Sequence, residues 1–222
     1  EGNPGLAVGN VVGSNIAILA LFLGSTALIH PLAVDRSLLR SDWPVMLAAT
    51  LAFIGLGWDL LFSYLDGIIL ISGVAILLVF FYRRSVAARK TEVPDDDEEE
   101  FDSFATRSYT LLTALIMLGA VGLNFGAEWF IAGARGIATA AGVSDHIIGV
   151  TVVAFGTSVP ELVASGAAAA KGESDLALGN LIGSNIFNIL LALGLTAIIH
   201  PVAVAPQALA HDAWWMLGIA AI

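Results

Sequence analysis

One carboxylate lies in the middle of an apolar stretch of the chain. Glu161 comes about fifteen residues after Ile147, in a run that is otherwise hydrophobic or small. Thr157 and Ser158 precede it by four and three residues, so on a helix the three oxygen-bearing side chains share one face. Hydroxyl and carboxylate oxygens are the ligands that hard cations prefer. The spacing therefore predicts a cation-binding site, although a structural acid satisfied by its neighbours is the alternative.

The same segment contains a predicted helix break at Gly156 and Pro160. Pro160 has no N–H to donate to the carbonyl of Gly156, and its ring opposes a regular helix there. Broken backbone at membrane depth is tolerated only where it lines protein or water. We therefore expect freed carbonyls, including that of Ala154, to face a cavity.

A second group of polar side chains follows in the next apolar stretch. Ser184 and Asn188 are spaced four residues apart, and Asn180 and Asn185 lie close by. Together with Glu161 they form an all-oxygen set without histidine or sulfur, which suits hard cations: Na⁺, Ca²⁺, Mg²⁺ or Mn²⁺. Ca²⁺ takes six to eight oxygens, so we expect a second acid from a segment preceding this chain.

The composition places these residues in a membrane protein. Of the 222 residues, 58% are hydrophobic and 13% are charged, and seven of the 28 charged residues are acids between Asp95 and Asp102. So little charge cannot cover the surface of a soluble enzyme. The net charge of −10 argues against a nucleic-acid partner, and the absence of cysteine excludes disulfides and thiol chemistry.

Hydropathy predicts six full membrane spans and part of a seventh that begins near Ala213, because a span needs about 20 apolar residues. We interpret the chain as a fragment of a longer protein. The predicted spans are Leu6–Ile29, Trp43–Phe62, Leu65–Tyr82, Thr110–Ala132, Ile147–Ala170 and Leu176–Ile199.

Lysine and arginine predict the orientation of these spans. With alternating crossings, eight of the nine basic residues fall on one side, and only Arg135 falls on the other. By the positive-inside rule that side is cytoplasmic, which places the acidic loop 91–103 there. We expect residues 91–107 to be a solvated linker between a first unit, 1–90, and a second unit, 108–222.

An internal repeat relates the two units. Residues 6–35 match residues 176–205 at 18 of 30 positions, including Asn10, Ser14 and Asn15. The two copies are five spans apart, an odd number, so they cross the membrane in opposite directions. Inverted repeats are typical of secondary transporters. The Gly9–Gly13 and Gly179–Gly183 spacings are also explained by close helix packing, and Ser or Asn in such helices by interhelical hydrogen bonds.

The segments Gly-Thr-Ser-Val-Pro-Glu161 and Gly179-Asn-Leu-Ile-Gly-Ser-Asn185 closely resemble the second signature repeat (about 142–200) of the calcium/cation antiporter superfamily, the sodium/calcium exchangers. Residues 6–23 resemble the latter half of the first signature repeat. The resemblance implies an all-α polytopic fold of two inverted five-helix repeats. It also implies a cation site; its ligands would be Glu161, Thr157, Ser158, the Ala154 carbonyl, Ser184, Asn188 and Ser14.

One position departs from the family pattern. Where the resemblance implies an amide in the first copy, the chain has Ile18, whereas the second copy keeps Asn188. Potassium-dependent relatives tend to carry Asp where Asn188 stands, so the chain favours potassium independence. The asymmetry bears on ion stoichiometry and selectivity.

These observations predict an antiporter, not an enzyme, that exchanges Ca²⁺ for Na⁺ by alternating access at the middle of a membrane, the prokaryotic plasma membrane. No cofactor is expected. The expected partners of the protein are the transported Na⁺ and Ca²⁺ ions and the lipid bilayer. The alternatives are an H⁺/divalent-cation antiporter of the same fold and a cation channel. As a fragment, the chain is expected not to transport by itself.

Overall fold

The computed structural model describes residues 4–29, 34–89, 109–143, 151 and 154–222. Within these ranges five helical stretches are long and apolar enough to cross a membrane: Ala7–Leu28, Leu38–Asp59, Tyr64–Arg84, Leu111–Ala140 and Ser174–Ile199. Each coincides with a predicted span, which confirms the all-α polytopic membrane class. The predicted span Ile147–Ala170 lies partly outside the described residues, as does the acidic loop 91–103.

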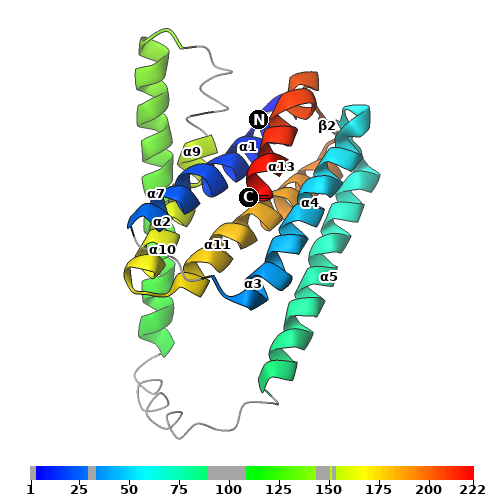
Figure 1. Ribbon diagram of the computed structural model, residues 1–222. Helices are drawn as coiled ribbons and strands as arrows, with labels where there is room; N and C mark the ends of the chain where they lie inside the picture. Colours follow the sequence, from blue (N-terminus) through cyan, green and yellow to red (C-terminus); the bar gives the residue numbers. More distant parts are fainter. Residues whose placement is uncertain (1–3, 30–33, 90–108, 144–150, 152–153) are drawn as a thin grey trace, which may run out of the picture.

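The first half of the chain forms a helix with a π-helical segment, followed by a helical hairpin whose second arm is long (Figure 1). Its elements are α1 (Pro4–Ile16), η1 (Ala17–Leu23), α2 (Gly24–Ile29), α3 (Arg36–Arg40), α4 (Asp42–Leu56), η2 (Gly57–Asp59), β1 (Leu61–Phe62) and α5 (Tyr64–Arg89). The segment η1 is a π-helix that continues directly from α1 into α2, so the three elements follow one another without a loop.

The second half begins with a long helix and later repeats the π-containing helix of the first half. Its elements are α7 (Tyr109–Ala140), α9 (Ala154–Thr157), α10 (Val159–Ala170), α11 (Ser174–Phe187), η4 (Asn188–Leu193), α12 (Gly194–Ile199), β2 (Val202–Ala203), η5 (Ala208–Asp212) and α13 (Ala213–Ala220). The segment η4 is again a π-helix. The predicted partial seventh span is therefore helical from η5 into α13.

The two copies of the repeat follow equivalent backbone paths. Both pass from an α-helix through a π-helix to a short α-helix, and the π-helices begin at Ala17 and Asn188, within one residue of equivalent positions. In Figure 1, α1 leads down toward α2, whereas α11 rises from the same region in the opposite direction. Sequence patterning gave no sign of the π-helices, which frequently occur at functional sites.

A two-stranded ribbon joins the ends of two spans and corrects one predicted boundary. Leu61 and Phe62 pair antiparallel with Ala203 and Val202, so they are strand residues and not the end of the span predicted to reach Phe62. The chain turns at Leu60, whose φ of 65° is left-handed, and the Asp59 carboxylate accepts a hydrogen bond from the Leu61 N–H at 3.1 Å. This local turn ends the helix before the apolar sequence does.

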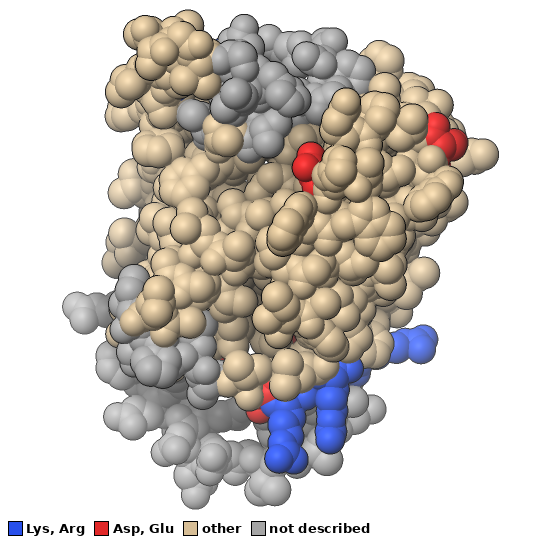
Figure 2. Space-filling model, turned by 45° about the horizontal axis from the view of Figure 1, so that its top comes forward, with Lys and Arg blue, Asp and Glu red and all other residues tan. Residues whose placement is uncertain are grey.

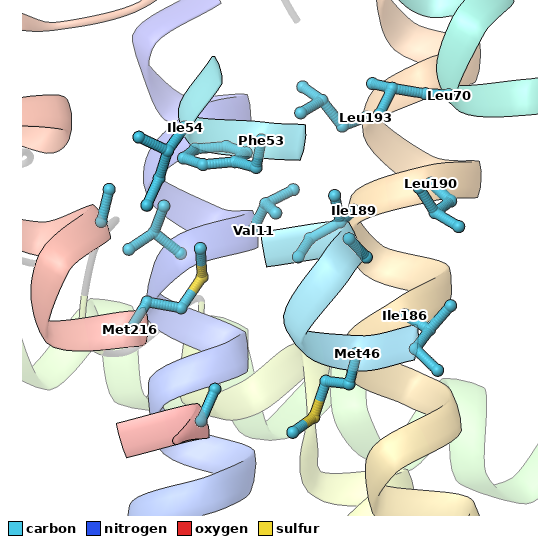
Figure 3. Packing of buried hydrophobic residues seen from close by; sticks show 14 of the residues in the cluster. Val11, Met46, Phe53, Ile54, Leu70, Ile186, Ile189, Leu190, Leu193 and Met216 are labelled. Atoms are coloured by element: carbon cyan, nitrogen blue, oxygen red, sulfur yellow. The ribbon is translucent and has the colours of Figure 1, made fainter. Parts of the chain in front are cut away.

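The main core lies where α1, α4, α5, η4 and α13 meet (Figure 3). Phe53, Ile189 and Met216 are almost fully buried there. Between α5 and α12 the backbones approach closely, because a Cβ on Gly67 would lie 2.8 Å from the Gly194 carbonyl oxygen. The core therefore holds the helices of both halves in contact around the polar residues described below.

The outer helices turn apolar side chains outward. In α7, no residue of the most apolar window is buried, and Ile116, Leu118 and Trp129 are among its exposed side chains. Such a surface is unfavourable in water and favourable in lipid, so the burial pattern agrees with a protein integrated in a membrane.

Candidate functional site

The predicted helix break is present and is centred on one residue. The helix α9 ends at Thr157 and α10 begins at Val159, while Ser158 between them has φ −99° and ψ 1°. Pro160 lies in the first turn of α10, where a missing N–H costs no hydrogen bond. Gly156 lies so close to α7 that a Cβ there would collide with the side chain of Ile131. The break therefore falls between the two predicted residues, at Ser158.

The break leaves one carbonyl surrounded by hydroxyl groups. The Ala154 carbonyl oxygen accepts hydrogen bonds from the hydroxyls of Ser14 (3.3 Å), Thr157 (3.1 Å) and Ser158 (3.1 Å). Ser14 comes from α1, 140 residues away in the chain, and is buried, as are Ala154 and Ser158. Each hydroxyl keeps lone pairs after donating its proton. The cluster thus presents several neutral oxygens within a small volume.

Glu161 lines a separate cavity of about 420 Å³ between α10 and α11. Its Oε2 atom is buried and has no hydrogen-bond partner among the described residues. The other lining residues are glycine, polar or aromatic: Gly179, Asn180, Gly183, Ser184, Phe187 and Asn188. A buried carboxylate oxygen without a partner is costly in a membrane span, and a bound cation would remove that cost.

Hydrogen bonds between amides connect the two groups of oxygens. The Asn188 Nδ2 donates to the Asn15 Oδ1 at 3.0 Å, and the Asn15 Nδ2 donates to the Asn185 carbonyl at 3.2 Å. On the other side of the break, the Thr157 hydroxyl donates to the Asn10 Oδ1 at 3.3 Å. The structure thus brings α1, α9 and α11 together at the polar residues that the sequence singled out.

The predicted residues divide into two sets by position. Glu161, Ser184, Asn188 and Asn180 line the cavity beside α10, whereas Ser14, Ala154, Thr157 and Ser158 gather at the Ala154 carbonyl. Asn15 and Asn185 are buried at the contact between α1 and α11. Among the described residues no three Asp, Glu, His or Cys side chains cluster as a metal site, so neutral oxygens dominate the set.

Ile18, the position at which the first copy departs from the family pattern, also has apolar neighbours. Ile18 is fully buried in a small cluster with Phe22 and Leu181, against which Phe155 and Leu162 pack. The first copy thus replaces the amide of the second copy by a hydrophobic contact.

The glycine pair of the second copy is not pressed against a neighbouring helix. A Cβ on Gly179 or Gly183 would meet no atom within 4 Å among the described residues, and both glycines line the cavity beside Glu161. Tight packing against the described residues therefore does not explain this spacing, in contrast to the close contact between Gly67 and Gly194.

Sequence reasoning missed two participants. Ser165 is fully buried and accepts a hydrogen bond from the Asn180 Nδ2 at 2.8 Å, which orients that amide at the cavity. Its place one helical turn after Glu161 was the available signal. Asp212, in η5, lines a second cavity together with Ala154. Nothing in its local sequence linked it to the site, because the contact depends on a helix 58 residues away.

Comparison with known proteins identifies the family of the chain. The family described as sodium/calcium exchanger protein matches residues 1–83 and 111–222, nearly the whole chain. The chain belongs to the sodium/calcium exchanger family. This confirms the resemblance found in the signature segments and makes the protein a member of a transporter family and not an enzyme.

Relatives and a solved structure agree with this membership. Sodium/calcium exchanger MaX1 of Methanosarcina acetivorans is 34% identical over 260 residues, covering 98% of this chain and 71% of the relative. Inner membrane protein YrbG of Escherichia coli is 35% identical over 219 residues, covering 98% and 67%. The solved sodium/calcium exchanger from Methanococcus jannaschii matches with a TM-score of 0.70 and 33% identity, covering 98% and 67%. The chain thus spans about two thirds of these exchanger-family proteins.

Proposed function

We propose that the protein is a secondary antiporter that exchanges Ca²⁺ for Na⁺ by alternating access at the oxygen-lined site. The observation that carries the proposal is the buried Oε2 of Glu161, which lacks a partner among the described residues and lies in a cavity with Ser184 and Asn188. The names of MaX1 and the Methanococcus jannaschii structure, which specify sodium and calcium, support the choice of ions.

In this proposal the site residues have separate roles. Glu161 neutralises part of the cation charge, and the side-chain oxygens of Ser184 and Asn188 replace hydration water in the same cavity. Ser14, Thr157, Ser158 and the Ala154 carbonyl form the second group of ligands, on the far side of the helix break. Na⁺ and Ca²⁺ compete for these oxygens, so that binding of one excludes the other.

Alternating access is supported by the arrangement of the repeats. The continuous helices α1–η1–α2 and α11–η4–α12 run in opposite directions (Figure 1) and meet at the equivalent residues Asn15 and Asn185. We take residues 1–90 and 108–222 as the two inverted units and 91–107 as the linker. Inverted units that meet at a central site allow one unit to rock against the other and to expose that site to each side in turn.

The charge distribution supports one orientation in the membrane. On the face drawn in Figure 2, the lysine and arginine side chains gather at one end of the molecule. The helical termini near this end include Arg36, Arg40 and Arg84. By the positive-inside rule this end is cytoplasmic, and with it the segment 91–103. The prokaryotic plasma membrane is the expected location.

Vesicle transport tests the proposal. In everted membrane vesicles that contain the full-length protein and are loaded with Na⁺, the protein should drive uptake of ⁴⁵Ca²⁺, and Glu161→Gln should abolish it. The matched control is Glu173→Gln, since Glu173 is exposed before α11 and does not line the cavity. Flux that persists in Glu161→Gln would overturn the assignment of the site.

The driving ion is tested in the same vesicles. Uptake that follows an imposed proton gradient and ignores Na⁺ would assign an H⁺/divalent-cation antiporter instead. Ca²⁺ flux that needs no counter-ion would assign a channel. The proposal requires that removing the Na⁺ gradient stops uptake.

A further inference from the structure

Two cavities of the structure are related by the internal repeat. The first, of about 570 Å³, is lined by residues of α1 and η1 and by Asp212. The second, of about 170 Å³, is lined by residues of α11 and by Asp42. Residues 170 positions apart are equivalent in the two copies. Lining residues of the two cavities pair in this way: Gly9 with Gly179, Val12 with Ile182, Gly13 with Gly183, Ile16 with Ile186, Ala17 with Phe187, and Asp42 with Asp212. Each copy of the repeat thus supplies one cavity wall, and an aspartate of the other copy completes it.

The two aspartates have different partners. The Asp42 carboxylate accepts a hydrogen bond from the Ser41 hydroxyl at 2.7 Å and lies 3.9 Å from an Arg84 guanidinium nitrogen. Asp212 is exposed to the cavity, and within the described part of the chain it has neither an ion pair nor a hydrogen bond. One cavity therefore has an acid with a basic partner, whereas the acid of the other has no charged partner among the described residues.

The cavity with Asp212 leads to the candidate cation site. Ala154 lies in its wall, and the carbonyl of this residue accepts the hydroxyls of Ser14 and Ser158. The remaining wall is mostly apolar, with Phe130 and Phe155 opposite α1. A single charge in a cleft with low-dielectric walls concentrates its field and raises the local concentration of cations.

We propose that Asp212 is a cation-recruiting residue at the outer access cavity, which draws Na⁺ and Ca²⁺ from the external solution toward the Ala154 carbonyl. This inference rests on the proposed function and on the orientation derived from the basic residues. Recruitment is one-sided, because Arg84 neutralises the equivalent Asp42 at the cytoplasmic end. Asp212 acts on the approach of the ion and not on its final coordination.

Transport from the outer face tests the proposal directly. In right-side-out vesicles loaded with Na⁺, Asp212→Asn should raise the KM for external Ca²⁺ roughly tenfold at low ionic strength and leave the maximal rate unchanged. Raising the ionic strength with N-methylglucamine chloride should shrink this difference, because salt screens the field. An unchanged KM at low ionic strength would overturn the proposal.

Asp59→Asn is the matched control for surface charge. Asp59 is an exposed acid at the same end of the molecule, beside β1, and lines neither cavity. The control should leave the KM for external Ca²⁺ unchanged. An equal rise in both variants would show that general surface charge, and not the cavity, recruits the ion, and would also overturn the proposal.

Chemical modification distinguishes the loss of the Asp212 charge from a folding defect of the variant. Residues 1–222 contain no cysteine, so in a full-length background free of other cysteines Asp212→Cys creates a unique thiol. Anionic methanethiosulfonate reagent applied from outside should restore a low KM in this variant, and the cationic analogue should raise it further. Two reagents with the same effect would contradict an electrostatic role. Asp212→Glu, which keeps the charge, should retain the low KM.

The outcomes distinguish this inference from the proposed function. If Glu161→Gln keeps full flux, the function assigned to the site fails, whatever Asp212 does. If Glu161→Gln abolishes flux while Asp212→Asn keeps its KM, only the recruiting role fails. Everted vesicles give a further check, because their outer surface is cytoplasmic and Asp212→Asn should leave the KM measured there unchanged.

Discussion

The two copies of the repeat share a backbone path but differ in chemistry at one equivalent position. In the first copy, Ile18 is fully buried against Phe22 and Leu181. In the second, Asn188 is half-buried, lines the cavity of Glu161 and donates to the Asn15 Oδ1 at 3.0 Å. Both positions fall at the start of a π-helix. The two copies therefore share a backbone path, while single residues decide which copy supplies a side-chain oxygen to the cavity of Glu161.

The copies also differ where they touch. Asn15 makes two hydrogen bonds to the other copy, through its Nδ2 to the Asn185 carbonyl and through its Oδ1 from Asn188. The Asn185 side chain makes no hydrogen bond to the first copy among the described residues. Its Nδ2 donates within its own helix to the Leu181 carbonyl, and its Oδ1 is buried without a partner among the described residues. Equivalent residues thus stabilise the contact unequally.

The largest effect is expected when the second copy is made like the first. Asn188→Ile removes an oxygen from the cavity of Glu161 and leaves the Asn15 Oδ1 without its donor. We expect Na⁺-driven ⁴⁵Ca²⁺ uptake to fall at least tenfold, which corresponds to about 1.4 kcal/mol. Asn188→Asp, which keeps the oxygen, should retain measurable uptake. Normal uptake in Asn188→Ile would show that the second copy needs no oxygen here.

The reverse change tests the apolar position of the first copy. Ile18→Asn places an amide at a fully buried position against Phe22 and Leu181, and an unpaired buried amide costs about 1–3 kcal/mol. We expect a lower Tm in detergent than for Ile18→Val, which removes a single methyl group. A Tm equal to that of the unmodified protein would mean that position 18 reaches a polar cavity, as position 188 does.

A smaller effect is expected at the contact between the copies. Asn15→Ala removes two interhelical hydrogen bonds, worth about 0.6 kcal/mol each in membrane proteins. Asn185→Ala removes only the bond to Leu181 within the helix. Thermal unfolding should therefore rank Asn15→Ala as the less stable variant. Equal losses would indicate that the contact is symmetric.

The smallest effect is expected at the glycine pair of the second copy. A Cβ at Gly183 meets no atom of the described residues within 4 Å, and alanine favours helix by up to about 1 kcal/mol over glycine. Gly183→Ala should leave the free energy of unfolding unchanged or slightly higher. Gly67→Ala is the control and should lower it clearly, because its Cβ would lie 2.9 Å from the backbone N of Ile198. Destabilisation by Gly183→Ala would restore the packing explanation of this spacing.

Much of this architecture follows from local sequence patterns. Apolar runs predicted the spans, and the self-match of residues 6–35 with 176–205 predicted two equivalent helical paths. Proline in an apolar run predicted a helix break close to Ser158. These features depend on backbone chemistry and on the spacing of residues within a few helical turns. The sequence of a single segment is therefore enough to predict them.

Other features did not follow from such patterns. The span predicted to reach Phe62 ends earlier, because a turn at Leu60 and strand pairing with a distant segment compete with the helix. The π-helices left no mark in the hydropathy. Ser165 and Asp212 gained their places near the site only through neighbouring helices.

By itself, the sequence determined the membrane class, the repeat and the residue types able to bind a cation, because hydropathy, periodicity and side-chain chemistry belong to the chain. Only the tertiary structure decided how these residues are grouped. It placed Ser14 at the Ala154 carbonyl, left the Glu161 Oε2 in a polar cavity and gave Asp42 a basic partner that Asp212 lacks among the described residues. Contacts between residues 40 to 170 positions apart depend on how helices pack, and local spacing carries no information about that.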